Sequence, residues 1–302
     1  MDSERFLPSQ HVSCLRYCSS RMKRILTAAL LILVVVTLIF RGQPWMLTLA
    51  AALVAELAAY EYLQLANAGV ASIPAWWMLC GTAVVFLFTL PNFPNGAELP
   101  ALSALALILL TWTGFRAPLD RVLPDAARGL FGLIYVAYPL TLIPMIWNRD
   151  DGKPLLLFLM VCVWAGDIAA YYVGRRYGRH KLSRLSPNKS WEGSIASVAG
   201  SVVAGLAVVF TGELLSTYYG NTVLHILEPV WQSAILAVII NVAAQLGDLL
   251  ESAIKRGVGV KDSGTMLPGH GGILDRIDAL LVAAPALWWV LLLKDAFGLG
   301  RF

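Results

Sequence analysis

Apolar residues are arranged in nine long runs along the chain, and short polar or glycine- and proline-containing segments separate them. A helix needs about 20 apolar residues to cross the hydrocarbon core of a bilayer, and the runs reach or come near that length. They lie near residues 25–40, 45–66, 75–90, 99–115, 129–147, 154–174, 194–215, 230–250 and 279–296. The sequence therefore predicts an all-α, polytopic integral membrane bundle of about nine transmembrane helices.

The amino-acid composition supports this membrane assignment. The 302-residue chain is 58% hydrophobic and only 14% charged, with a mean hydropathy of +0.69. Soluble domains carry roughly 25% charged residues on average.

The basic residues lie between the apolar runs instead of forming one patch, so we expect no nucleic-acid partner. The four cysteines lack the spacing of a metal site, and we assign them no function.

Lysine and arginine residues indicate the orientation of the chain, because cytoplasmic loops are enriched in them. With the N-terminus in the cytoplasm, 18 of the 23 basic residues fall on the cytoplasmic side. Miscounting one span would reverse every later loop and remove this contrast. The sequence therefore predicts a cytoplasmic N-terminus, with the polar segments 175–193 and 251–278 on the cytoplasmic side.

Two regions of the chain differ in character. Residues 1–21 are polar and show no helical apolar period, so we expect a disordered N-terminal extension. Met22 begins a short basic stretch before the first apolar run, which makes it an alternative start of translation. Residues 22–302 are predicted to form a single membrane catalytic domain whose specific motifs lie within 164–278.

The most polar part of the chain reads GDLLESAIKRGVGVKDSGTMLPGHGGILDRID, residues 247–278, and it lies between two apolar runs. Charged residues are costly beside a bilayer, so such a density of charge predicts a functional site. One helical face carries Asp248, Glu251, Ser252 and Lys255, because their spacing is i, i+3, i+4 and i+7. This face brings carboxylates and a cation together at the end of the eighth run.

A magnesium site is predicted where the eighth run ends and the ninth begins. Asp248 and Asp275 flank the connection between these runs, and a hairpin of two helix ends can bring them together. Mg²⁺ accepts one or two protein carboxylates and completes its coordination with phosphate oxygens and water. Asp278, Asp167 and Glu251 are further candidate ligands.

Two polar features are predicted to bind phosphate. His270, in PGHGG, has no second histidine or thiolate nearby in sequence, which argues against zinc. We expect it to donate to a phosphate, while the adjacent glycines allow the backbone to approach closely. In SPNKSWEG, a turn at Asn188 presents Lys189, a point charge suited to a nucleotide triphosphate. The chain has no GxxxxGK[ST] sequence, so a P-loop fold is excluded.

The run SAIKRGVGVKDSGTMLPGHGGILDRID, residues 252–278, resembles the signature of the phosphatidate cytidylyltransferases, also called CDP-diacylglycerol synthases. The matching positions are Ser252, Lys255, Arg256, Lys261, Asp262, Pro268, His270, Gly271, Gly272, Asp275, Arg276 and Asp278. The GDLLES, WAGDIAAYYVGRRYG and SPNKSWEG segments are also similar to that family. Ser190 stands where the family pattern has threonine, which keeps the hydroxyl group. The resemblance covers residues 22–302.

The resemblance implies that CTP and phosphatidic acid react to give CDP-diacylglycerol and pyrophosphate. It implies a homodimer in a bacterial inner membrane, with Mg²⁺ in a site facing the cytoplasm. A second cation such as K⁺ could share this site. The residues expected to stabilise the reacting phosphates are Lys255, Arg256, Lys261, His270 and Arg276. Those expected to bind substrate are Asn188, Lys189, Ser252, Gly271 and Gly272.

Two other classes of protein share some of these features. A CTP-dependent kinase of polyprenol or another lipid alcohol would also work at a membrane border, but the intact HGG…DRID ending argues against it. An ion-coupled transporter would also place acids in a helical bundle, near the midplane and often within inverted repeats. Here the acids are skewed to one side, and the 247–278 pattern is not repeated.

Overall fold

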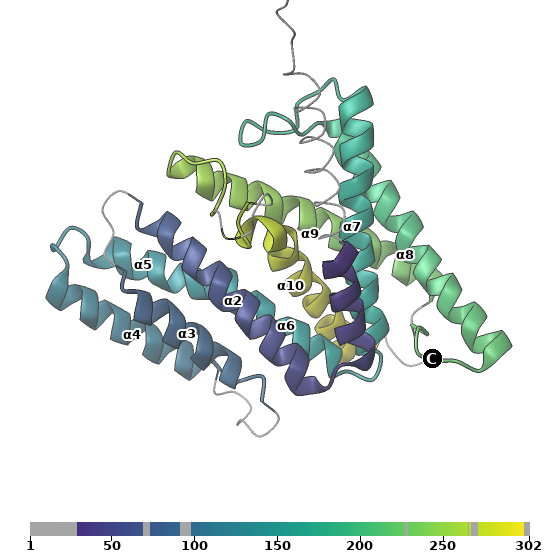
Figure 1. Cartoon of the computed structure of the whole chain (residues 1–302), viewed down its shortest axis with the longest axis horizontal. Coiled ribbons are helices and arrows are strands. Elements are labelled where there is room, and N and C mark those ends of the chain that lie inside the picture. The colour runs from purple at the N-terminus through teal and green to yellow at the C-terminus, as the bar shows by residue number, and fades with distance from the viewer. Residues whose placement is uncertain are drawn as a thin grey trace, which may run out of the picture.

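The computed structural model describes residues 29–68, 73–90, 98–226, 229–264, 266 and 271–298. These residues form a bundle of helices, which confirms the predicted fold class (Figure 1). After a short helix at Ala29–Arg41, the elements are α2 (Pro44–Ala66), α3 (Ala75–Leu87), α4 (Glu98–Arg116), α5 (Val122–Gly132), η1 (Leu133–Ala137), α6 (Tyr138–Trp147), α7 (Gly152–Tyr177), α8 (Trp191–Tyr219), α9 (Val230–Gly257) and α10 (Leu274–Phe297).

Within the described residues, seven helices are long and apolar enough to cross a membrane. The elements α5, η1 and α6 form one of them, a continuous span from Val122 to Trp147. Two further apolar helices, Ala29–Arg41 and Ala75–Leu87, are shorter than a bilayer requires. A helix lies at each predicted apolar run, but the count of nine spans is not confirmed.

The helix ends follow local sequence signals. Pro44 occupies the first turn of α2, where its missing N–H costs no hydrogen bond. Ser190 precedes α8, and its hydroxyl accepts a hydrogen bond from the Gly193 N–H at 3.2 Å. Gly220 ends α8 with a φ of 62°, a left-handed conformation that glycine adopts without steric cost. The Ser190 cap thus fixes the start of α8 at Trp191, within the SPNKSWEG segment.

Helix α10 joins the two parts of the hydrophobic core. One cluster of buried residues is built mainly from α7, α9 and α10 and includes Phe158 of α7 and Leu287 of α10. The other is built mainly from α2, α3 and η1 and includes Leu281 of α10. Because α10 contributes to both clusters, its N-terminal end is held between the two groups of helices.

Two polar connections lie at the same end of the bundle (Figure 1). The loop 178–190 follows α7, and the described parts of the connection between α9 and α10 lie near it. The turn between α6 and α7 lies at the opposite end. The two segments that carry the predicted phosphate-binding residues therefore share one end of the membrane bundle.

Candidate active site

The loop between α7 and α8 is folded back on the start of α8 by Glu192. Its carboxylate accepts hydrogen bonds from the backbone N–H groups of Arg179 at 3.1 Å and His180 at 3.3 Å, and it pairs with the His180 ring at 2.6 Å. The Leu182 N–H also donates to the Lys189 carbonyl at 2.9 Å. The loop is thus closed at its base, which sets the position of Lys189.

Lys189 forms an ion pair with Asp248 on α9, 59 residues further along the chain. Both side chains remain partly open to solvent, with 28% of Lys189 and 35% of Asp248 exposed. The predicted phosphate-binding lysine and the predicted metal ligand therefore meet in one site. A ligand approaching the end of the bundle can reach both of them.

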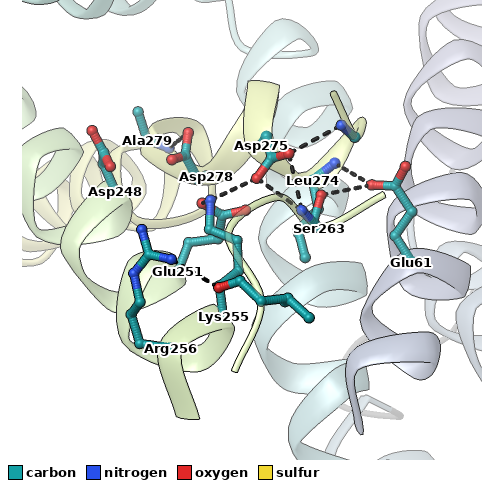
Figure 2. A network of polar contacts seen from close by, with 12 residues as sticks. Glu61, Asp248, Glu251, Lys255, Arg256, Ser263, Leu274, Asp275, Asp278 and Ala279 are labelled. Carbon is teal, nitrogen blue, oxygen red and sulfur yellow. Dashed lines mark hydrogen bonds and ion pairs between the residues drawn. The ribbon is translucent and has the colours of Figure 1, made fainter. Parts of the chain in front are cut away.

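Asp275, in the first turn of α10, is held by three donors (Figure 2). Its carboxylate accepts from the backbone N–H groups of Ser263 and Gly272, both at 3.0 Å, and from the Lys255 ammonium at 2.6 Å. Lys255 also pairs with Glu251 at 2.6 Å, one turn earlier on α9. The predicted shared face of Glu251 and Lys255 is confirmed by this contact.

Asp278 lies one turn after Asp275 on α10, within electrostatic range of Asp248 (Figure 2). The close approach of the two helices depends on Gly247, because a Cβ atom there would lie 2.3 Å from the Asp278 carbonyl oxygen. Asp167, on α7, lies within electrostatic range of Asp248 and Lys189. Carboxylates from three helices therefore face one region.

Glu61, which is not among the site residues predicted from the sequence, supports this region from α2. Its side chain is completely buried, and its Oε2 atom accepts hydrogen bonds from the Ser263 hydroxyl at 3.0 Å and the Leu274 N–H at 2.9 Å. A Cβ atom at Gly264 or Gly272 would lie within 2.6 Å of this carboxylate. The glycines of the motif thus make room for Glu61, whose contacts hold the segments that bind Asp275. Its sequence signals are its place in an apolar run near the end predicted to be cytoplasmic, and the tyrosines on either side of it.

Other predicted residues surround this centre. The Arg256 guanidinium donates to the Val260 carbonyl at 3.0 Å, while Lys261 and Arg276 are exposed near the same connection. Gly271 has a φ of 79°, which favours glycine. Asn188 is exposed in the α7–α8 loop, and Ser252 is half-buried on α9. His270 lies outside the described residues.

The donor set fits a hard divalent cation that also binds phosphate. Among the residues the structure describes, no three His, Cys, Asp or Glu side chains form a ready metal-binding group. Mg²⁺ does not require one, because it is bound through one or two carboxylates together with substrate phosphates. Asp248, Asp275 and Asp278 would supply the carboxylates for such a cation, and Lys189 and Lys255 place positive charge beside Asp248 and Asp275.

Comparisons with known proteins place the chain in a family. The sequence pattern described as the cytidylyltransferase family matches residues 22–293. The phosphatidate cytidylyltransferase of Synechocystis sp. is 31% identical over 301 residues, which cover 90% of this chain and 96% of that protein. The enzyme of the same name from Mycobacterium leprae is 32% identical over 276 residues, covering 86% and 83%. That from Brucella suis is 41% identical over 163 residues, covering 54% and 55%.

Proposed function

This chain belongs to the cytidylyltransferase family, and we propose that it transfers the cytidylyl group of CTP to phosphatidic acid. The products are CDP-diacylglycerol, a precursor for phospholipid biosynthesis, and pyrophosphate. One observation carries the proposal beyond the family match: Lys189 pairs with Asp248 and Lys255 with Asp275, at one end of a membrane bundle. A water-soluble triphosphate and a lipid phosphate can meet at such a site.

In the proposed reaction, an oxygen of the phosphatidate phosphate attacks the α-phosphorus of CTP. The new P–O bond forms as the bond to the β-phosphate breaks, and pyrophosphate leaves. Such transfers depend on positioning and on neutralisation of charge. A phosphomonoester is already ionised near neutral pH, since its second pKa is about 6. The chain therefore needs no strong general base.

Lys189 and Lys255 are proposed to neutralise the phosphates. Each ammonium has three N–H donors, and each is anchored here by a carboxylate, so each can also donate to a phosphate oxygen. Arg256, Lys261 and Arg276 lie around the same connection and add positive charge. The role predicted for His270 as a further donor stays a prediction.

We propose that Asp248 and Asp275 would hold Mg²⁺, with Asp278 beside them. When bound, the cation supplies positive charge at the triphosphate. The Ser263 and Gly272 N–H groups fix the orientation of the Asp275 carboxylate, and Lys189 restrains that of Asp248. A cytoplasmic position of the site is supported by the distribution of basic residues. The homodimer and a second cation such as K⁺ stay predictions from the family resemblance.

The purified protein should be incubated with CTP and Mg²⁺ and given either phosphatidate or a polyprenol. We expect CDP-diacylglycerol from phosphatidate and no phosphorylated polyprenol. Asp248→Asn and Asp275→Asn should each lower turnover roughly a hundredfold or more, because a lost metal ligand costs several kcal/mol of transition-state stabilisation.

Asp295→Asn is the matched control, since Asp295 pairs with Arg149 in a part of the chain outside the site. It should retain near-normal turnover. Phosphorylation of the polyprenol in place of product from phosphatidate would contradict the proposed function. Near-normal turnover of either site variant at ordinary Mg²⁺ would contradict its assignment as a ligand.

A further inference from the structure

Tyr135 lies in a wider helical turn that interrupts the α-helical span Val122–Trp147. Residues Leu133–Ala137 form a π-helix, closed by a hydrogen bond from the Tyr138 N–H to the Leu133 carbonyl. Pro139 explains the position of this turn, because a proline lacks an N–H and its ring clashes with the carbonyl four residues earlier, that of Tyr135. π-Turns within α-helices are frequent at functional sites.

The ring of Tyr135 is fixed by aromatic neighbours. Only 8% of the residue is exposed, and its ring stacks on Phe131 with a centroid distance of 5.3 Å and an angle of 9°. The Tyr62 ring lies 6.5 Å away at a tilted angle. A Cβ atom at Gly132 would lie 2.5 Å from the Tyr62 ring, so this glycine permits the close packing. The direction of the Tyr135 hydroxyl is therefore set by the fold.

The two tyrosine hydroxyls of this cluster differ in one respect. Tyr62 donates to the Arg128 carbonyl at 2.9 Å. The buried Tyr135 hydroxyl has no hydrogen-bond partner among the residues that the structure describes. Burying a hydroxyl without a partner is unfavourable, and most buried polar groups in proteins are hydrogen-bonded. This donor is thus left available at a cost to stability.

The surroundings of this hydroxyl identify the site it serves. It lies within electrostatic range of the carboxylates of Glu251, Asp278 and Asp248, which belong to the active site on α9 and α10. None of these carboxylates accepts a hydrogen bond from it. The phenol therefore belongs to a different element, η1, from the acids that α9 and α10 supply.

We propose that Tyr135 is a substrate-binding residue whose O–H donates a hydrogen bond to a phosphate oxygen in the active site. The proposal rests on the cytidylyltransferase function proposed above. Phosphate oxygens are strong acceptors, and a phenol keeps its proton at neutral pH and can donate it. The acceptor belongs either to the CTP triphosphate or to the phosphatidate phosphate. Both present the same chemistry.

The test compares Tyr135→Phe with Tyr62→Phe, which remove one hydroxyl each from the same aromatic cluster. Initial rates are measured with CTP and phosphatidate varied separately, together with thermal unfolding in detergent. We expect Tyr135→Phe to lower kcat/KM roughly ten- to a hundredfold, as for loss of a hydrogen bond to a charged group. Its thermal stability should be unchanged or higher. Tyr62→Phe should show the opposite pattern, with lower stability and normal kcat/KM.

The Michaelis constants identify the source of the phosphate. A higher KM for phosphatidate alone assigns the contact to the lipid phosphate, and a higher KM for CTP alone assigns it to the nucleotide. A lower kcat with both constants unchanged assigns it to the transferring phosphate in the transition state. Normal kinetics of Tyr135→Phe, with an active wild type, would overturn this inference alone. A wild type that makes no CDP-diacylglycerol would overturn the proposed function, and the inference with it.

Discussion

Replacing Glu61 with alanine removes an acceptor that two separate segments use. Its Oε2 atom receives the Ser263 hydroxyl and the N–H of Leu274, which is the first residue of α10. No part of Glu61 is exposed, so water cannot replace these bonds without rearrangement. Each buried donor left without a partner costs about 1–3 kcal/mol, so for both the loss is about 2–6 kcal/mol. Whole domains are stable by only ~5–15 kcal/mol.

Glutamine at the same position should lower the stability less than alanine does. Its amide oxygen can accept both bonds, but neutral hydrogen bonds are roughly half as strong as those to a carboxylate. We expect Glu61→Gln to lose about 1–2 kcal/mol. Activity should also fall, because Ser263 and Gly272 next to Glu61 hold the Asp275 carboxylate. A displacement of about 1 Å at such a group can lower the rate on the order of a hundredfold.

The assay combines thermal unfolding in detergent with the initial rate of CDP-diacylglycerol formation, measured well below the unfolding transition. We expect the order wild type, Glu61→Gln, Glu61→Ala in both stability and turnover. Glu56→Gln is the control on the same helix, since the buried Oε2 of Glu56 has no hydrogen-bond partner in the described part of the chain. Wild-type stability and turnover of Glu61→Ala would refute the reasoning.

Three further outcomes are expected. Lys189→Ala should lower kcat/KM for CTP roughly a hundredfold, as for loss of one positioned donor, whereas Arg179→Ala in the same loop should change kcat/KM little. Equal small effects of the two substitutions would indicate that the basic residues of this loop only orient the chain in the membrane. Gly247→Ala should lower stability by about 1–3 kcal/mol in thermal unfolding, because its Cβ would overlap the backbone of α10. In a variant without native cysteines, Arg184→Cys should react with a membrane-impermeant thiol reagent only from the cytoplasmic side and Thr217→Cys only from the outside; the reverse would contradict the predicted orientation.

Local sequence patterns predicted the structure correctly where it depends on local contacts. The apolar runs predicted the helices, since a segment in lipid must satisfy its backbone hydrogen bonds internally. The four-residue spacing of Glu251 and Lys255 predicted their contact, because helix geometry places such positions on one face. The ends of several helices lie beyond the apolar runs, as at Tyr177 and Gly257, because α7 and α9 continue into polar sequence.

The remaining parts of the site depend on contacts between distant segments. Glu61 is 202 residues from Ser263 in sequence, and no periodicity links an acid on α2 to a loop before α10. The meeting of Lys189 with Asp248 follows from how α8 and α9 pack, so the sequence could identify both residues but not their pairing. The π-turn at Tyr135 combines a nearby proline with tertiary packing. That the Tyr135 hydroxyl has no partner among the described residues becomes visible only in the folded chain.

Tracing the α-phosphorus and the γ-phosphorus of CTP into the products tests the central claim most directly. The purified protein in phosphatidate-containing vesicles should be given CTP labelled either at the α-phosphorus or at the γ-phosphorus. Cytidylyl transfer predicts that the α-label enters the lipid fraction as CDP-diacylglycerol and that the γ-label appears in pyrophosphate. Both outcomes should require Mg²⁺ and disappear together in Asp275→Asn. A γ-label in the lipid fraction, with the α-label left in CDP, would show a kinase and contradict the account.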